Sequence, residues 1–220
     1  MVVFCGRQMS QQTRKMACTT FNVTVPTELH KIYTTVEVVC AVVSFFGNLL
    51  VLIAFVRFRR VRSVTNYYVI SLAVADLLVA VVGIPSALAT SVGLPRHFRL
   101  CLFMNSILML LCTGSILSLV AVTVDRFWAV VRPLTYTVDM TGRRAQVIIA
   151  CCWTTATVIG LLPSAGWNAG KPLEPRCFFM EVMDFRYLAF VYFATIVAPS
   201  LFMAVVYVII FKVVRRQVVC

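Results

Sequence analysis

Several polar residues lie inside long apolar runs, where ionisable side chains are costly and usually serve a function. Asp76 lies in the middle of one run, in the segment SLAVADLL, and Glu37 lies near the start of an earlier run. Each carboxyl group is expected to belong to a functional site or to have a plain structural role. For Asp76 that role is protonated or hydrogen-bonded packing, and for Glu37 it is a carboxylate that reaches the membrane interface.

Two further polar groups in these runs need partners. Asn48 lies in the segment GNLLV, and a buried amide in a membrane helix needs a hydrogen-bonding partner on a neighbouring helix. Asp76 is the predicted partner of Asn48. Asp125 and Arg126 follow another apolar run, so they are expected to pair with each other at the membrane interface or simply to end a helix among headgroups.

The elements that position these residues are predicted to be five membrane-spanning helices. The chain of 220 residues is 61% hydrophobic and only 13% charged, whereas soluble domains carry roughly 25% charged residues. A helix needs about 20 apolar residues to cross a bilayer. The runs that meet this length are residues 34–56, 67–91, 101–124, 145–164 and 187–211. The chain is therefore predicted to be an all-α integral membrane bundle, with a tail (1–33), one membrane domain (34–216) and a short end (217–220).

The distribution of basic residues predicts how the chain is oriented. The net charge is +12, but the arginines flank apolar runs, which favours lipid headgroups over nucleic acid as their partner. With the N-terminus outside, the inner side carries eleven Lys and Arg residues and the outer side nine. Asn22 begins a glycosylation sequon, which requires an extracellular N-terminus. No signal-peptide pattern precedes it, so the first span is expected to direct insertion at the plasma membrane.

The positions of the histidines and cysteines argue against an enzyme and against a metal site. The only two histidines, His30 and His97, lie outside the spans, and no metal-ligand spacing or Ser/Lys dyad occurs within them, so no enzyme and no metal site is predicted. Most of the nine cysteines lie in apolar runs, where free thiols pack as small hydrophobes.

The ordered motifs resemble those of rhodopsin-like G-protein-coupled receptors across residues 34–216. They are Gly47-Asn48, the segment LAVAD ending at Asp76, Cys101 to Asp125-Arg126, Trp153, and Pro199 followed by Tyr207. Within that family the chain is most similar to adenosine receptors. This similarity rests on CLFM from Cys101, PLTY to Tyr136, TGRRA from Thr141, GLLPSAGWN from Gly160, CFF from Cys177, and Glu37.

The resemblance implies a purine-nucleoside site at the outer end of the bundle. It implies a disulfide between Cys101 and Cys177, and it implies that Phe179 stacks on the adenine ring. The implied ligand-binding residues are Phe179, Glu37, Leu108, Cys112, Met180, Glu181, Ala87 and Val191. The chain departs from the family pattern at Met180, where a glutamate is usual, at Val191 and at Thr113. Leu108 replaces the aspartate of amine receptors, which argues against an amine ligand.

The resemblance also implies two sites deeper in the bundle. Asp76 and Ser115 match part of an allosteric sodium pocket, the only cofactor expected, because a hard cation prefers oxygen ligands. At the inner end, the implied G-protein-coupling residues are Asp125, Arg126, Leu134, Tyr136 and Tyr207. Asp125 is expected to restrain Arg126 and to accept a hydrogen bond from Tyr136.

The predicted function is a receptor that binds an extracellular adenosine-like molecule and signals to a heterotrimeric G protein, with a receptor dimer and membrane lipid as further partners. Two alternatives stay open. The first is that the sequence ends after the fifth of seven helices and acts, if at all, through association with full-length receptors. The second is a lipid or other non-amine ligand, although Met104 and Asn105 stand where phospholipid receptors usually carry a charged pair.

Overall fold

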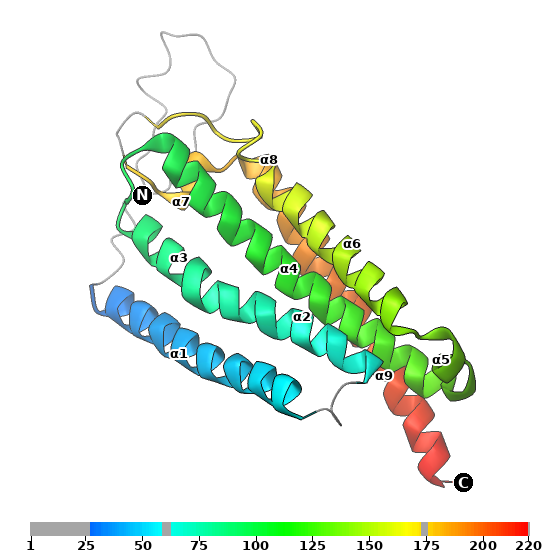
Figure 1. Ribbon diagram of the computed structural model, residues 1–220. Helices are drawn as coiled ribbons and strands as arrows, with labels where there is room; N and C mark the ends of the chain where they lie inside the picture. Colours follow the sequence, from blue (N-terminus) through cyan, green and yellow to red (C-terminus); the bar gives the residue numbers. More distant parts are fainter. Residues whose placement is uncertain (1–26, 59–62, 173–175, 220) are drawn as a thin grey trace. The chain divides into compact units, whose positions relative to one another are not determined.

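A computed structural model describes three stretches of the chain, residues 27–58, 63–172 and 176–219 (Figure 1). The predicted glycosylation site Asn22 lies outside the described residues. Residues 1–38 and 39–220 form two compact units, and the first helix, α1 (Thr27–Arg57), has residues in both. α1 begins inside the predicted N-terminal tail, because the segment TELHKIY is too polar to count as an apolar run and nevertheless forms helix.

The second unit contains the remaining helices. They are α2 (Val64–Leu78), α3 (Ile84–Ser91), α4 (Phe98–Val131), α5 (Pro133–Asp139), α6 (Gly142–Leu161), α7 (Phe179–Val182), α8 (Phe185–Val191) and α9 (Ala198–Val219). Within the described residues, five helical stretches are long and apolar enough to cross a membrane: Thr34–Arg57, Val64–Ser91, Phe98–Val131, Gly142–Leu161 and Phe185–Gln217. The predicted all-α membrane bundle with five spans is confirmed.

These helices carry apolar side chains on their outer as well as their inner faces. Large hydrophobic residues of α9, including Leu201, Phe202 and Val205, are exposed, and the same holds for Val147 and Val158 of α6. A helix that is hydrophobic all round is stable only inside a large core or in lipid. The outer faces of this bundle therefore fit the hydrocarbon of a bilayer.

Helix α4 lies at the centre of the second unit and packs against α2, α6 and α9 (Figure 1). Small residues let α4 and α6 approach closely, as is usual between membrane helices. A Cβ atom added at Gly160 of α6 would lie 2.5 Å from the Cα atom of Leu110 in α4. Gly114 of α4 similarly faces Ala156 and Trp153 of α6. This close seam holds α6 against α4, the helix that carries Cys101, Leu108, Cys112, Ser115, Asp125 and Arg126.

Two prolines interrupt the regular helical hydrogen bonding of their spans. A π-helical segment, Val79–Gly83, joins α2 to α3, which contains Pro85, and a second, Tyr192–Val197, joins α8 to α9, which contains Pro199. Proline lacks an N–H group and its ring collides with the carbonyl group four residues earlier. A widened turn just before each proline relieves that collision without ending the span.

The inner end of the third span differs from the prediction. α4 continues beyond residue 124 to Val131, so Asp125 and Arg126 lie within the helix and do not end it. The apolar residues Phe127 and Trp128 extend the run, and Pro133 disfavours helical geometry at the preceding residue, Arg132. Helix α5 then forms in the connection between the apolar runs 101–124 and 145–164, where no helix was predicted.

Candidate functional site

The loop between α6 and α8 is attached to the rest of the bundle at several points. The predicted disulfide between Cys101 at the start of α4 and Cys177 is present, with 5.6 Å between the two Cα atoms, and both residues are buried. The N–H group of Cys177 also donates to the carbonyl oxygen of Gly93 at 3.0 Å. Within the loop itself, the N–H group of Ala169 donates to the carbonyl oxygen of Val182 at 3.0 Å. These bonds fix the loop segment from which Phe179 projects.

Phe179 opens the short helix α7 and is half-buried. It packs against a cluster whose buried members are Met183, Tyr187 and Val191, which we call the outer apolar cluster. The Tyr187 hydroxyl group donates to the carbonyl oxygen of Ile159 at 3.1 Å, which ties α8 to the end of α6. The structure therefore brings together two predicted ligand-binding residues from different helices, Phe179 of α7 and Val191 of α8.

The other predicted ligand-binding residues lie in varied surroundings. Met180 and Glu181 follow Phe179 and are exposed, whereas Leu108, Cys112 and Ala87 are half-buried in α4 and α3. Leu108 lies against Gly83, because a Cβ atom there would come within 3.3 Å of the Leu108 Cδ1 atom. Glu37 is half-buried in the first compact unit, residues 1–38, and the rest belong to the second.

Two residues of this region, Tyr187 and Met109, are not among the predicted ligand-binding residues. Tyr187 is a buried member of the outer apolar cluster, and Met109 packs against it. Helical spacing carries a signal for both: Tyr187 lies four residues before Val191, and Met109 lies three residues before Cys112. Residues at these spacings share one face of a helix.

Asp76 finds its partner on α4. The hydroxyl group of Ser115 donates to Asp76 Oδ1 at 2.5 Å, which joins the two residues predicted for the sodium pocket. The predicted bond between Asn48 and Asp76 is wrong. The Asn48 amide group instead donates to the carbonyl oxygen and the hydroxyl group of Ser44, at 2.9 and 3.2 Å, within its own helix. One turn of helix was sufficient to satisfy that amide, so it required no neighbouring helix.

At the other end of α4, Asp125 is held by a tyrosine. The Tyr136 hydroxyl group donates to Asp125 Oδ1 at 2.7 Å, as predicted, and its oxygen lies 3.0 Å from the Thr65 hydroxyl group. Because the tyrosine proton goes to Asp125, Thr65 is the donor in the second bond. Burial raises the pKa of Tyr136, so the phenol stays protonated at neutral pH. This triad joins α2, α4 and α5.

Arg126 and Asp125 were expected either to pair with each other or to end the helix, and neither is seen in the described residues. Asp125 is 1% exposed and its Oδ2 atom has no hydrogen-bond partner, whereas Arg126 is exposed. Within the described part of the chain, no residue forms an ion pair with the Arg126 guanidinium group. Neighbouring residues of a helix point in different directions, which separates the two charges. Two other residues predicted to contact the G protein are also exposed: Leu134 by 87% and Tyr207 by 52%.

The order of helices, the disulfide at one end of α4, and the adjacent residues Asp125 and Arg126 near the other end define a class of membrane receptor. The chain belongs to the rhodopsin family of seven-transmembrane receptors, since the family profile "7 transmembrane receptor (rhodopsin family)" matches residues 47–219. This confirms the family expected from the motifs, and it is a family of receptors and not of enzymes.

The chain is similar to adenosine receptors. It is 40% identical over 200 residues to "Adenosine receptor A2a" of Homo sapiens and 39% identical over 200 residues to that of Canis lupus familiaris. These matches cover 84% of this chain and 48% of each relative. It is also 38% identical over 203 residues to "Adenosine receptor A2b" of Bos taurus, covering 84% of this chain and 61% of that relative. The chain thus spans about half the length of the A2a relatives.

Proposed function

We propose that this chain provides part of an adenosine-type receptor, which binds a purine nucleoside at the Cys101 end of α4 and contacts a heterotrimeric G protein at the Asp125 end. The observation that carries the proposal is the placement of Phe179. A disulfide and backbone hydrogen bonds fix its loop, and its ring lies against the outer apolar cluster in a protein whose relatives are adenosine receptors.

The chemistry around Phe179 suits a purine. A flat aromatic ring beside aliphatic and thioether side chains favours the faces of another planar ring. Leu108 offers no counter-ion to a protonated amine, which supports a neutral ligand. Met180 cannot accept a strong hydrogen bond from an exocyclic amine, but Glu181 is the next residue and is exposed. We assign to Glu181 the role of accepting that bond.

The inner end offers groups that suit a protein partner. Arg126 is exposed and carries an unpaired charge, and Leu134 of α5 presents an apolar side chain that is 87% exposed. Tyr136 holds α5 in place through its bond to Asp125. An exposed cation and an exposed apolar residue, both near the Asp125 end of α4, suit a partner segment that has both polar acceptor groups and an apolar face. We assign Arg126, Leu134 and Tyr207 to contact with the G protein.

This assignment requires the N-terminus to lie outside the cell. The excess of Lys and Arg on the loops at the Asp125 end supports that orientation. The disulfide supports it as well, because disulfides form on the oxidising side of the plasma membrane.

Asp76 and Ser115 fit a sodium ion as two oxygen ligands on facing helices, with one formal negative charge between them. When bound, the ion would supply a positive charge between α2 and α4. We expect the affinity of an agonist to depend on NaCl concentration in the wild type, and to lose that dependence in Asp76→Asn. Unchanged salt dependence in the variant would rule out this site.

Ligand binding tests the main proposal. Residues 1–216 would be fused to the part of human Adenosine receptor A2a that follows the matched region, and the binding of a tritiated adenosine analogue would be measured in membranes beside the unfused chain. We expect Phe179→Ala in the fusion protein to weaken binding by about ten-fold, since ring contacts contribute roughly 1 kcal/mol beyond area burial.

Phe185→Ala is the matched control, because Phe185 is an aromatic residue at the same end of the bundle and is 72% exposed. It should leave the affinity unchanged. Equal affinities of the Phe179→Ala variant and the wild type would contradict the purine site.

A further inference from the structure

A cavity of about 430 Å³ lies among the end of α4, helix α5 and the start of α6. It contains neither Arg126 nor Leu134, so it is distinct from most of the surface proposed for the G protein. Its lining includes Trp128, Asp139, Arg143, Arg144, Val147 and Ile148. We call it the α5–α6 cavity.

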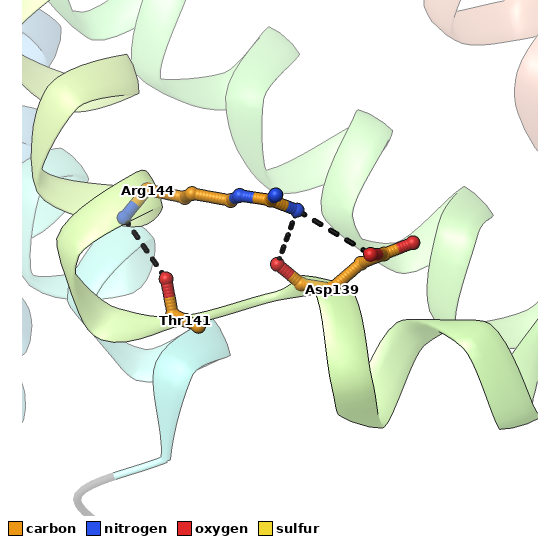
Figure 2. A network of polar contacts seen from close by, with 3 residues as sticks. All are labelled: Asp139, Thr141 and Arg144. Atoms are coloured by element: carbon orange, nitrogen blue, oxygen red, sulfur yellow. Dashed lines mark hydrogen bonds and ion pairs between the residues drawn. The ribbon is translucent and has the colours of Figure 1, made fainter.

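One side of the α5–α6 cavity is polar, and its charges are unequal. Arg144 reaches back over the turn to Asp139, as Figure 2 shows, with its guanidinium group 2.7 Å from the carbonyl oxygen and 3.5 Å from the carboxylate. The Thr141 hydroxyl group accepts a hydrogen bond from the Arg144 N–H group at 3.4 Å and caps α6. Asp139 is therefore already neutralised by Arg144.

Arg143 is the second cation on the polar side of the cavity. It is exposed, and none of the residues that the structure describes gives it a hydrogen bond or an ion pair. The first turn of α6 has no acidic residue, although acids are favoured there by the positive end of the helix dipole. The helix terminus and Arg143 together make this side of the cavity attractive to an anion.

The other side of the cavity is apolar and lies deeper in the spans. Val147 and Ile148 follow Arg143 and Arg144 by four residues each, so each apolar side chain lies one turn along α6 from an arginine, on the same face. Trp128 of α4 faces the same space. All three apolar side chains are more than a third exposed, at 56%, 38% and 38%. The cavity thus changes from cationic to apolar over one helical turn, at the level where the spans end.

We propose that the α5–α6 cavity binds an anionic glycerophospholipid from the leaflet at this end of the bundle. Arg143 and the α6 terminus hold the phosphate, and an acyl chain lies along Val147, Ile148 and Trp128. A soluble phosphate compound would leave that apolar wall uncovered, and a zwitterionic lipid such as phosphatidylcholine carries its own cation, which offsets the charge of its phosphate beside Arg143. The proposal does not depend on the identity of the receptor's ligand.

Trp128 provides the readout, because bromine atoms on an acyl chain quench the fluorescence of a tryptophan in contact with them. The wild-type chain would be placed in nanodiscs of phosphatidylcholine with a fixed fraction of dibromo-phosphatidylserine, or with the same fraction of dibromo-phosphatidylcholine. Trp128→Phe in the same discs gives the signal of the other two tryptophans, which is subtracted. We expect the serine lipid to quench Trp128 about five-fold more effectively, since one arginine near an anionic headgroup gives about that preference.

Arg143→Gln should remove most of this preference. The matched control is Arg215→Gln, which removes an equal charge from an exposed arginine of α9 that does not line the cavity, and it should keep the preference. Circular dichroism of each variant confirms that the helices are intact. Equal quenching by the two brominated lipids in the wild type would overturn the proposal, as would equal losses in Arg143→Gln and Arg215→Gln.

Discussion

At the Cys101 end of α4, a covalent bond and backbone hydrogen bonds hold the loop that carries Phe179. At the Asp125 end, helix α5 is joined to α2 and α4 through side-chain hydrogen bonds of Tyr136, and one oxygen of the buried Asp125 has no partner. Regions held by fewer bonds open at lower free energy. The comparison indicates that the Cys101 end is built to stay in place, whereas the Asp125 end can rearrange more easily.

Loss of the disulfide should have the largest effect on stability, and it tests whether the Cys101 end is held by the covalent bond. Cys101→Ser should lower the free energy of unfolding by about 4 kcal/mol, because the bond joins residues 76 positions apart and restricts the unfolded chain. Titration of the detergent-solubilised chain with sodium dodecyl sulfate measures that change. Cys151→Ser is the control, since Cys151 is a free and exposed thiol. Equal unfolding midpoints for the two variants would show that the covalent bond does not hold this end.

The seam between α4 and α6 supports the same end by close packing. Gly160→Ala should cost about 1–3 kcal/mol, because the new methyl group would meet the Leu110 backbone, which cannot rotate away. Gly47→Ala in α1 is the matched control, since no atom lies within 4 Å of the added Cβ position. The same titration compares the two. A Gly160→Ala variant as stable as Gly47→Ala would mean that the helices are not this close.

At the inner end, Tyr136→Phe should have a smaller effect on unfolding, about 1–2 kcal/mol. It removes the donor to Asp125 Oδ1 and leaves a buried carboxylate without a partner. Tyr67→Phe serves as the control, because Tyr67 is a half-buried tyrosine of α2 whose ring lies against Phe55. If both variants are equally stable, the hydrogen bond to Asp125 adds nothing.

The smallest expected effect is a pH dependence. Burial raises the pKa of Tyr136 above its ordinary value of 10.0, so the folded chain keeps this proton when the unfolded chain loses it. The resulting stabilisation is complete below pH 10 and is lost as the pH rises from there through the pKa of the folded state. The wild type should therefore lose more stability than Tyr136→Phe as the pH rises above 10, the ordinary pKa of a tyrosine. Parallel pH profiles for the two proteins would contradict the effect of burial.

The sequence predicted the features that depend on composition and motif order. The five spans follow from apolar length, and the Cys101–Cys177 bond and the Tyr136–Asp125 bond follow from the resemblance to known receptors. Asp76 was singled out as a carboxyl group that is either functional or part of hydrogen-bonded packing. Ser115 was named beside it through the sodium pocket and is that partner.

Features that depend on local competition between bonds were not predictable in this way. The Asn48 amide is hydrogen-bonded within its own helix, to Ser44. The pattern of apolar runs does not indicate whether such an amide bonds within its helix or to another helix. Helix α5 forms because Pro133 starts a new helix after α4 ends. A search for long apolar runs does not find it, because it has only seven residues. The α5–α6 cavity depends on side chains from three elements, so no single stretch of sequence indicates it.

The proposed function requires that the disulfide-linked loop positions Phe179 for a nucleoside. A double-mutant cycle on the fusion protein tests it, with the affinity of the tritiated adenosine analogue measured for Phe179→Ala, Cys177→Ser and the double variant. If the disulfide acts through Phe179, each single change weakens binding about ten-fold and the double variant is little weaker than either alone. Normal affinity in Cys177→Ser, or losses that add in full, would contradict the account.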